Sequence, residues 1–412
     1  MATLPATGFG PLSDIRVIEM GQLLAGPFCG QLLGDFGAEV IKIEPPGVGD
    51  PMREWGREKP HGRSLWWPVI ARNKKSIEVN AREPEGQDII RKLVAESDIL
   101  LENFRPGTME KWGLGYDELV KINPKLVMIR VSGYGQTGPY SSKAGFGAVG
   151  EAMGGLRYVV GDPSTPPSRT GISIGDTLAA TFACIGGLMA LHAVKRTGRG
   201  QVVDSAIYEA VLAMMESLVT EYDAGGYIRE RTGAILPNVA PSNVYLTRDD
   251  RYILIAANQD SVFKRLAQAM GQPGLAADPR YATHSARGAH QAELDGIVEQ
   301  WTKTMDADDL AKLLDDSGVP CGNIYRAPEM LEDAHFKARE AIVKVPHPVF
   351  GELRMQATFP KLSETPGRVS SCGPQLGEHN DEIFGSLLKL SESQQQDLRL
   401  RGIIGQRRRE AA

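Results

Sequence analysis

The sequence predicts an α/β protein with a parallel sheet in a large domain, followed by a smaller α+β domain. In the first half of the chain, short β-rich runs alternate with helical ones, which is typical of parallel strands joined by helices. From about Gly225 the pattern changes to a β-hairpin followed by helices. The chain has 412 residues, 42% of them hydrophobic, which is enough for two domains with sizeable cores.

Five runs in the first half are rich in β-branched and aliphatic residues. These predicted strands are Ile15–Glu19, Val40–Glu44, Ser76–Val79, Ile99–Glu102 and Leu126–Ser132. Helices are predicted at Pro27–Phe36, which has Pro at its start and Gly37 after its end, and at Glu85–Glu96, where apolar residues recur at helical spacing. Several strands end in polar or glycine-rich loops, which form the ligand-binding rim of open parallel sheets. We therefore expect the functional site at that rim.

The later part of the chain predicts a hairpin, three helices and a final strand pair. The hairpin strands are Asn243–Thr247 and Tyr252–Ala256, around a polar turn. The predicted helices are Ser261–Met270, Gln291–Met305 and Ala307–Ser317, and the final strand pair is Val343–Val345 with Glu352–Met355.

Composition excludes several classes of function. The net charge is -5 with no long basic face, so we expect no nucleic-acid partner. We find no signal peptide and no run of about 18 uncharged apolar residues, so we expect a cytoplasmic protein without a membrane partner. The four cysteines lack disulfide or CxxC spacing, and the seven histidines lack zinc-ligand spacing, so we expect no metal site.

Asp176 precedes the long run Thr177–Val194, which is apolar nearly all round and predicts a buried helix. The simpler interpretation is an N-cap, in which the Asp side chain accepts a helical N–H and stabilises the helix by about 1 kcal/mol. The positive helix end would equally keep the carboxylate ionised, and an ionised carboxylate can attack an activated acyl carbon. These residues alone leave both roles open.

The loop Gly133–Gly138 matches GxGxxG after a predicted strand. A dinucleotide-binding oxidoreductase would need a helix directly after the glycines, but Pro139 and Tyr140 follow, so we reject that interpretation. The loop more plausibly covers a bound ligand. Its backbone N–H groups, including those of Gly135 and Gln136, are candidates to stabilise a developing negative oxygen.

Basic residues recur in the loops beside the predicted sheet. They are Arg53, Arg72, Lys74, Lys75, Arg82, Arg105 and Lys111. Each alone is most simply a solvated side chain, but together they could hold a phosphate-bearing ligand. Asn103, Phe104 and Arg105 add an amide, an aromatic ring and a cation in one loop, which suits an adenine ring and a phosphate as well as it suits a helix cap and turn.

At this point the sequence resembles the class III CoA-transferase family, the CaiB/BaiF type. The resemblance rests on eight ordered blocks that run through nearly the whole chain: Gly21–Arg53, Arg72–Asn80, Leu101–Gly107, Ile129–Tyr140, Ile172–Ala179, Lys195–Gln201, Gly318–Ile324 and Leu376–Ile383. It implies that Asp176 is the catalytic nucleophile and that CoA enters as a substrate thioester, without a further cofactor. The CoA-contacting positions that it implies are Ala25, Arg53, Asn73, Lys74, Lys75, Arg82, Asn103, Phe104, Arg105 and Lys111.

The resemblance also implies the organisation of the chain. It implies a Rossmann-like large domain built from both termini and an interlocked homodimer. With the change of pattern near Gly225, this gives three segments: 1–224 in the large CoA-binding domain, 225–335 in the small domain, and 336–412 returning to the large domain.

Two departures from relatives bear on the reaction. Racemases of the superfamily carry a GHD motif where this chain has Gly145, Phe146 and Gly147, so transfer is favoured over racemisation. The chain also lacks the consecutive glycines that formyl-CoA transferases place over their site. Several blocks resemble enzymes that use succinyl-CoA and malate, citramalate or itaconate, and Arg169 is a candidate clamp for the acceptor's distal carboxylate. A 2-methylacyl-CoA racemase, a CoA-transferase for another acid and a non-catalytic CoA-binding subunit remain alternatives.

Overall fold

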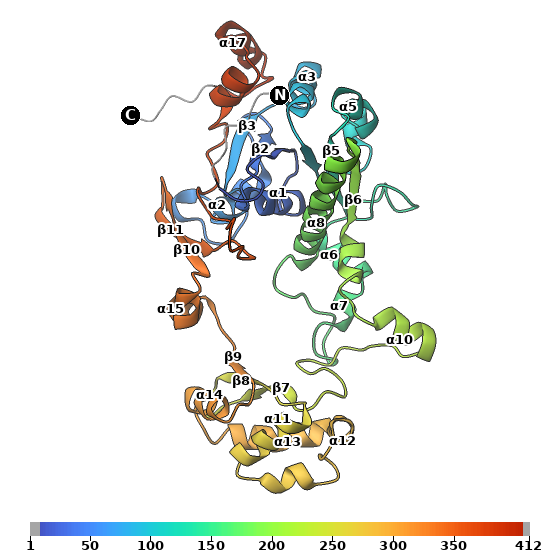
Figure 1. Ribbon diagram of the computed structural model, residues 1–412, viewed down its shortest axis with the longest axis vertical. Coiled ribbons are helices and arrows are strands. Elements are labelled where there is room, and N and C mark those ends of the chain that lie inside the picture. Colours follow the sequence, from blue (N-terminus) through green and yellow to red (C-terminus); the bar gives the residue numbers. More distant parts are fainter. Residues whose placement is uncertain (1–8, 407–412) are drawn as a thin grey trace. The chain divides into compact units, whose positions relative to one another are not determined.

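The computed structural model describes residues 9–406 and divides the chain into two compact units (Figure 1). The first unit combines Met1–Leu156, Gly171–Val219 and Lys337–Ala412, and the second combines Arg157–Thr170 and Thr220–Phe336. The first unit is therefore discontinuous in sequence, because the segment after Phe336 packs with the N-terminal half of the chain.

The first unit contains most of the strands and the longest helix. Its strands are β1 (Arg16–Glu19), β2 (Glu39–Glu44), β3 (Lys74–Glu78), β4 (Ile99–Glu102), β5 (Val127–Ser132), β6 (Val202–Ala206), β10 (Ile342–His347) and β11 (Gly351–Gln356). Its helices are α1 (Ala25–Asp35), α2 (Trp67–Ile70), α3 (Pro84–Ala95), α4 (Thr108–Lys111), α5 (Tyr116–Ile122), α6 (Gly147–Met153), α8 (Ile174–Thr197), α9 (Ile207–Leu212) and α17 (Glu392–Leu400). Helices α7 (Leu156–Val159), α10 (Leu218–Gly225) and α16 (Ala334–Ala338) lie at the borders between the units.

Strands β1 to β6 form one parallel sheet in the order β3-β2-β1-β4-β5-β6, which confirms the predicted parallel sheet. The five predicted strands all form, within two residues of the expected ends. Strand β6 was missed because its five residues, VVDSA, include an acid and a serine and follow a polar loop. The strand order reverses between β1 and β4, and in open sheets of this kind the crevice at that point is where ligands bind.

Alternating strand residues build a separate core on each face of the sheet. On one face Val17, Val40 and Ile129 pack against α1 and α8. On the other face Ile18 and Ile41 pack with α3, α5 and the C-terminal helices. This alternation is the period-two pattern of strands that are covered on both faces.

The C-terminal segment closes the β3 edge of the sheet. Val79 forms an isolated bridge with Ile404, and the Asn80 N–H donates to the Ile403 carbonyl at 2.8 Å. Farther back, the His379 N–H donates to the Ser76 carbonyl at 2.9 Å. Covering an exposed edge in this way removes a surface that would otherwise pair with another strand.

The second unit is a smaller α+β fold, as the sequence predicted. Its elements are β7 (Ser242–Leu246), β8 (Tyr252–Ala256), β9 (Cys321–Asn323), α11 (Asp260–Ala269), α12 (His284–Ala289), α13 (Gln291–Thr302), α14 (Ala307–Asp316) and α15 (Ala327–Glu332). The predicted hairpin is confirmed, since β7 and β8 pair antiparallel, and β9 adds a third strand that the sequence analysis missed. Tyr245, Phe263 and Leu310 are fully buried in its core.

Helix α8 differs from its prediction in two ways. It begins at Ile174, ahead of the predicted start. Only 33% of the residues in its most apolar 18-residue stretch are buried within this chain. Its inner face packs on α1, β5 and β6, while Ile185 and Met189 are exposed on the outer face. By its length and apolar composition α8 could cross a membrane, so the expectation that no run reaches this limit is wrong, although the packing of its inner face is that of a core helix.

Candidate active site

Asp176 lies within the first turn of α8, at its third residue, and is partly buried. The residue before the helix is Ser173, whose side chain makes no capping hydrogen bond. The predicted N-cap role of Asp176 is therefore wrong, because the helix starts at Ile174, three residues before the predicted apolar run. An acidic side chain in the first helical turn still interacts favourably with the positive end of the helix dipole, which favours the ionised carboxylate.

The carboxylate of Asp176 packs against the backbone of Gly147, the first residue of α6. A Cβ atom at position 147 would lie 2.3 Å from the Asp176 Oδ2 and 2.8 Å from its Cγ. Only glycine leaves room for the carboxylate in this position. Gly147 also belongs to the segment that departs from the racemase motif, but nothing in the sequence places it beside Asp176.

Glu151 lies one turn farther along α6 and is fully buried beneath the start of α8. Its Oε1 accepts the Gly175 N–H at 3.3 Å, and a Cβ at Gly175 would lie 2.9 Å from the Glu151 Cγ. Gly147 and Gly175 thus let α6 and the first turn of α8 approach closely. Glu151 was not among the predicted site residues, because an isolated Glu in a sequence carries no signal of burial.

The glycine-rich loop after β5 uses two of its candidate N–H donors inside the protein. The Gly135 N–H donates to the Ser132 Oγ at 3.0 Å, and the Gln136 N–H donates to an Asp204 oxygen at 2.8 Å. The expected oxyanion role of these two groups stays a prediction that the geometry disfavours. The side-chain Nε2 of Gln136, in contrast, is buried without a hydrogen-bond partner among residues 9–406 and is the better donor candidate.

The crevice where the strand order reverses is fixed by hydrogen bonds between the loops after β1 and β4. The Asn103 Oδ1 accepts the Gln22 N–H at 2.8 Å, and its Nδ2 donates to the Gln22 carbonyl at 2.9 Å. Leu23 has φ of 62°, a left-handed conformation that costs a non-glycine residue about 1 kcal/mol or more, and its N–H donates to Asp50 at 3.0 Å. Predicted site residues Ala25 and Asn103 therefore shape the crevice, and Ala25 itself is buried in α1.

A buried ion-pair network holds this loop from below. Lys42 donates to the Gly21 carbonyl at 2.7 Å and pairs with Glu19 at 3.0 Å and Asp50 at 2.8 Å. Burial disfavours the charged form of Lys42, but the carboxylates of Asp50 and Glu19 outweigh it and raise its pKa. Burial would also raise the pKa of Asp50, but Lys42 holds it below the ordinary value. Both groups are therefore ionised at neutral pH.

Four of the predicted CoA contacts are engaged inside the fold. Lys74 is fully buried and pairs with Glu19 at 2.7 Å, and burial lowers its pKa despite that pair. Arg53 forms two hydrogen bonds to the Glu44 carboxylate, at 2.8 and 2.7 Å. The further pairs are Lys75 with Glu39 and Glu382, and the Asn73 amide with Asp35. Their CoA-binding role stays a prediction, and the structure gives each of them a structural partner instead.

Other predicted CoA contacts lie at the surface near the carboxyl ends of the strands. Arg82, Arg105 and Lys111 are exposed, and the salt bridges among residues 9–406 include none of the three. Arg105 donates to the Ser142 carbonyl at 3.1 Å. Phe104 is half-buried and packs edge-on against Trp112, with ring centroids 5.2 Å apart. These cations can meet a phosphate without breaking an ion pair.

Arg169 is exposed and belongs to the second unit, whereas Asp176 belongs to the first. The segment 167–173 that separates Arg169 from the start of α8 contains no strand. The role of Arg169 as an acceptor clamp stays a prediction. Among residues 9–406, no three His, Cys, Asp or Glu side chains are grouped so that they could hold a metal ion.

A parallel sheet with a ligand-binding crevice and a carboxylate at the start of a long helix are features of an enzyme. A family model for CoA-transferase family III matches residues 12–380, and the chain belongs to this family. It is a CoA-transferase.

Several individual relatives within this family are named for particular substrates. The chain is 61% identical over 394 residues to a succinyl-CoA--D-citramalate CoA-transferase of Chloroflexus aurantiacus, covering 96% of this chain and 98% of the relative. It is 40% identical over 397 residues to the beta subunit of a succinyl-CoA--L-malate CoA-transferase of the same organism, covering 96% and 98%. The crystal structure of a CaiB/BaiF family protein from Brucella suis matches with a TM-score of 0.82 at 34% identity, covering 92% of this chain and all of the other.

Proposed function

We propose that the enzyme transfers CoA from succinyl-CoA to a C4 or C5 dicarboxylic acid, with D-citramalate as the first candidate acceptor. The observation that carries this proposal is the 61% identity, over nearly the full length of both chains, to an enzyme named for that pair of substrates. Relatives named for L-malate and for glutarate share 40% and 34% identity, so the acceptor class is more widely supported than the individual acid.

In the proposed first half-reaction, Asp176 acts as the nucleophile. A carboxylate oxygen of Asp176 attacks the thioester carbonyl of succinyl-CoA, the C–S bond breaks, and CoA leaves as the thiolate. The thiolate then attacks the aspartyl carbonyl of the mixed anhydride and releases succinate. The product is an aspartyl-CoA thioester, so one thioester has replaced another and no outside energy source is required.

The second half-reaction repeats these steps with the acceptor acid. An acceptor carboxylate attacks the aspartyl thioester and releases CoA thiolate, which attacks the acceptor's acyl carbon in the new anhydride. Acyl-CoA forms and the Asp176 carboxylate is restored. Its place in the first turn of α8 supports this role, because the helix dipole favours the charged form that must attack.

We propose that CoA lies along the crevice between β1 and β4. The exposed cations Arg82, Arg105 and Lys111 supply charge for its phosphates, and Phe104 supplies an aromatic surface for its adenine ring. The Asn103 side chain contributes by holding the adjoining loop through both of its bonds to Gln22. Such preorganised contacts position the thioester relative to the nucleophile.

The test is a kinetic comparison of acceptors, with succinyl-CoA as donor and D-citramalate, L-malate, itaconate and glutarate as acids. We expect CoA transfer with the highest kcat/KM for D-citramalate. Asp176→Asn should lower kcat by at least roughly a thousandfold, because it removes the nucleophile. Asp117→Asn, on the exposed face of α5, is the control and should keep full activity. Exchange of the α-proton of an acyl-CoA with solvent deuterium, without an acceptor acid, would instead indicate a racemase.

We also propose that the enzyme is an interlocked homodimer in which the outer face of α8 is covered. Phe182, Ile185, Leu188 and Met189 are exposed along that face. Beside it lies a mostly apolar groove of about 890 Å³ between α1, α8 and the segment after β11. Large apolar side chains that gather on one exposed face mark protein interfaces. Light scattering should give the dimer mass for the wild type and a lower mass for Met189→Glu, but not for Lys312→Glu on the surface of α14.

A further inference from the structure

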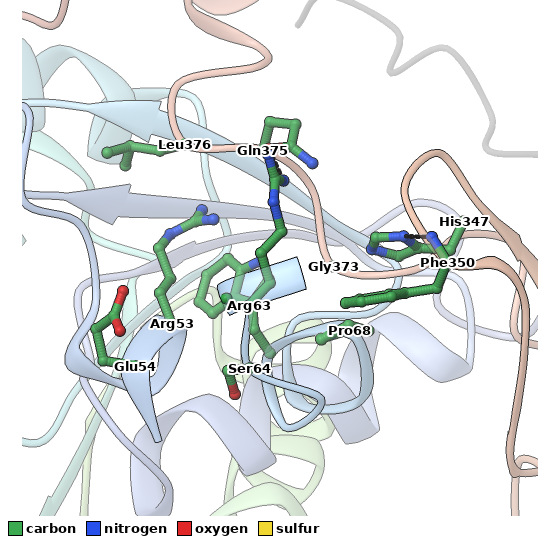
Figure 2. A pocket seen from close by; sticks show the side chains of 12 residues that line it. Arg53, Glu54, Arg63, Ser64, Pro68, His347, Phe350, Gly373, Gln375 and Leu376 are labelled. Carbon is green, nitrogen blue, oxygen red and sulfur yellow. Dashed lines mark hydrogen bonds between the residues drawn. The ribbon is translucent and has the colours of Figure 1, made fainter. Parts of the chain in front are cut away.

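The first unit also contains a polar cavity of about 260 Å³, and Arg53 is the predicted CoA contact that lines it (Figure 2). One wall comes from the short helices η1 (Pro51–Glu54) and η2 (Pro60–Gly62) and the start of α2. The other wall comes from the β10–β11 turn and residues 373–376. Pockets for drug-sized ligands begin at about 300 Å³, so this cavity is too small for CoA and suits a molecule of a few heavy atoms.

His347, the last residue of β10, presents a buried N–H donor to this cavity. It is 6% exposed, and its Nδ1 accepts the N–H groups of Val349 and Phe350 at 3.1 and 3.2 Å. A ring nitrogen that accepts carries no proton, so the proton of the neutral ring is on Nε2. Burial and the nearby charge of Arg63 lower the pKa of His347, which favours that neutral form. Figure 2 shows the ring facing the cavity, across from Arg63.

Arg63 is the cation of the cavity without a charged partner. Its Nη1 donates to the Gln375 Oε1 at 3.0 Å, and it takes part in no ion pair among residues 9–406. Arg53, in contrast, is neutralised by Glu44 and also donates to the Pro374 carbonyl at 3.1 Å. Glu54, at the rim, pairs with Lys59 at 3.3 Å. Arg63, which is exposed to solvent, is therefore the positive charge at the cavity that no carboxylate of the described residues neutralises.

The remaining walls are aromatic and apolar. The Phe350 ring lies 4.5 Å from the His347 ring, and Trp67 and Pro68 close the inner side. A guanidinium fork and an N–H donor match the oxygens of a carboxylate, while these walls match a short hydrocarbon chain, which inorganic phosphate lacks. We propose that this cavity binds a small carboxylic acid, with Arg63 pairing with its carboxylate and His347 donating from Nε2.

Two sources of such an acid are possible, and both have the same chemistry at this site. The first, which rests on the proposed function, is a dicarboxylic acid that is a substrate or product of CoA transfer. The second is an acid that binds here and changes the rate without being consumed. Kinetics separates them, since loss of a substrate site raises the acceptor's KM, whereas loss of an effector site removes the response of kcat to added succinate.

The test measures binding of succinate to the full-length protein by calorimetry, with inorganic phosphate as a second probe. We expect His347→Asn and Arg63→Gln each to weaken succinate binding roughly tenfold or more. Asn is chosen because its side-chain oxygen can still accept the Val349 and Phe350 N–H groups, while the Nε2–H donor is lost. The same comparison on an Asp176→Asn background needs no catalysis, so failure of the transfer mechanism would leave this result intact.

Arg57→Gln is the matched control, because it removes the same charge from a side chain that is 96% exposed and outside the cavity. Equal weakening by Arg57→Gln and Arg63→Gln would overturn the proposal, since net charge alone would then explain the effect. So would succinate binding that is unchanged in His347→Asn and Arg63→Gln, or phosphate that binds more tightly than succinate. Thermal unfolding of each variant checks that it is folded.

Discussion

Two groups of basic residues beside the sheet look alike in the sequence and differ in the structure. The interior group, Lys42, Lys74 and Arg53, meets carboxylates of Glu19, Asp50 and Glu44 at 2.7 to 3.0 Å. The rim group, Arg82, Arg105 and Lys111, is exposed and has no ion pair among residues 9–406.

This difference indicates that a basic residue with a buried carboxylate partner stabilises the fold, whereas an exposed basic residue without such a partner is available to bind a ligand. Removing an interior cation leaves a buried carboxylate without its counter-charge, whereas removing a rim cation leaves only water to reorganise.

The largest effect is expected for an interior cation. Lys74→Ala should lower the free energy of unfolding by about 3–5 kcal/mol, because Glu19 loses one of its two buried ammonium partners. Urea unfolding measures this loss. A fully stable Lys74→Ala enzyme with a raised KM for succinyl-CoA would place Lys74 in the CoA site and break the comparison.

Removing a rim cation should weaken CoA binding and leave the stability of the protein unchanged. Arg105→Ala and Lys111→Ala should each raise the KM for succinyl-CoA roughly tenfold, the size of a charge-assisted hydrogen bond, with the unfolding midpoint unchanged. Steady-state kinetics at two ionic strengths measures it, since phosphate contacts weaken with salt. An unchanged KM for succinyl-CoA in the double variant would show that CoA does not bind in this crevice.

The ion pairs of the interior group should also affect how the stability of the protein changes with pH. The folded pKa of Asp50 lies below its unfolded value, so its contribution to stability is present above the unfolded pKa and is lost as pH falls through the folded pKa. Unfolding curves between pH 7 and pH 3 should therefore show a shallower loss of stability in Asp50→Asn, starting from a lower value at pH 7. Parallel curves would mean that Asp50 is not held ionised by Lys42.

The smallest effect is expected at an exposed ion pair of the second unit. Lys312 and Asp316 pair at 2.7 Å on α14, but both side chains are more than half exposed. Lys312→Ala should change the unfolding midpoint by less than the error of the measurement, since solvent screens such pairs. A loss comparable with that of Lys74→Ala would show that burial does not decide the value of these pairs.

The sequence predicts local structure here better than long-range pairing. Strand β4 forms over the predicted residues Ile99–Glu102. This run of three aliphatic residues and a Glu is too short for a helix and lies between turns, so a buried strand is the structure that fits it. Asp176 was placed at the right helix but outside it, because Ile174 and Gly175 give no apolar pattern that extends the helix backwards. One of the two partners of Lys75, Glu382, lies 307 residues away, and no spacing rule predicts such a contact. The exposed face of α8 was likewise hidden, since its composition is apolar on both sides.

The proposed mechanism requires Asp176 to carry CoA between donor and acceptor. Mass spectrometry of the protein after incubation with succinyl-CoA and then hydroxylamine detects this carrier, because hydroxylamine converts an activated aspartyl group to a hydroxamate. We expect the hydroxamate on the peptide that contains Asp176, only when succinyl-CoA is present, and none in Asp176→Asn. An unmodified Asp176 in an enzyme that transfers CoA at full rate, or a hydroxamate on another acid, would contradict the account.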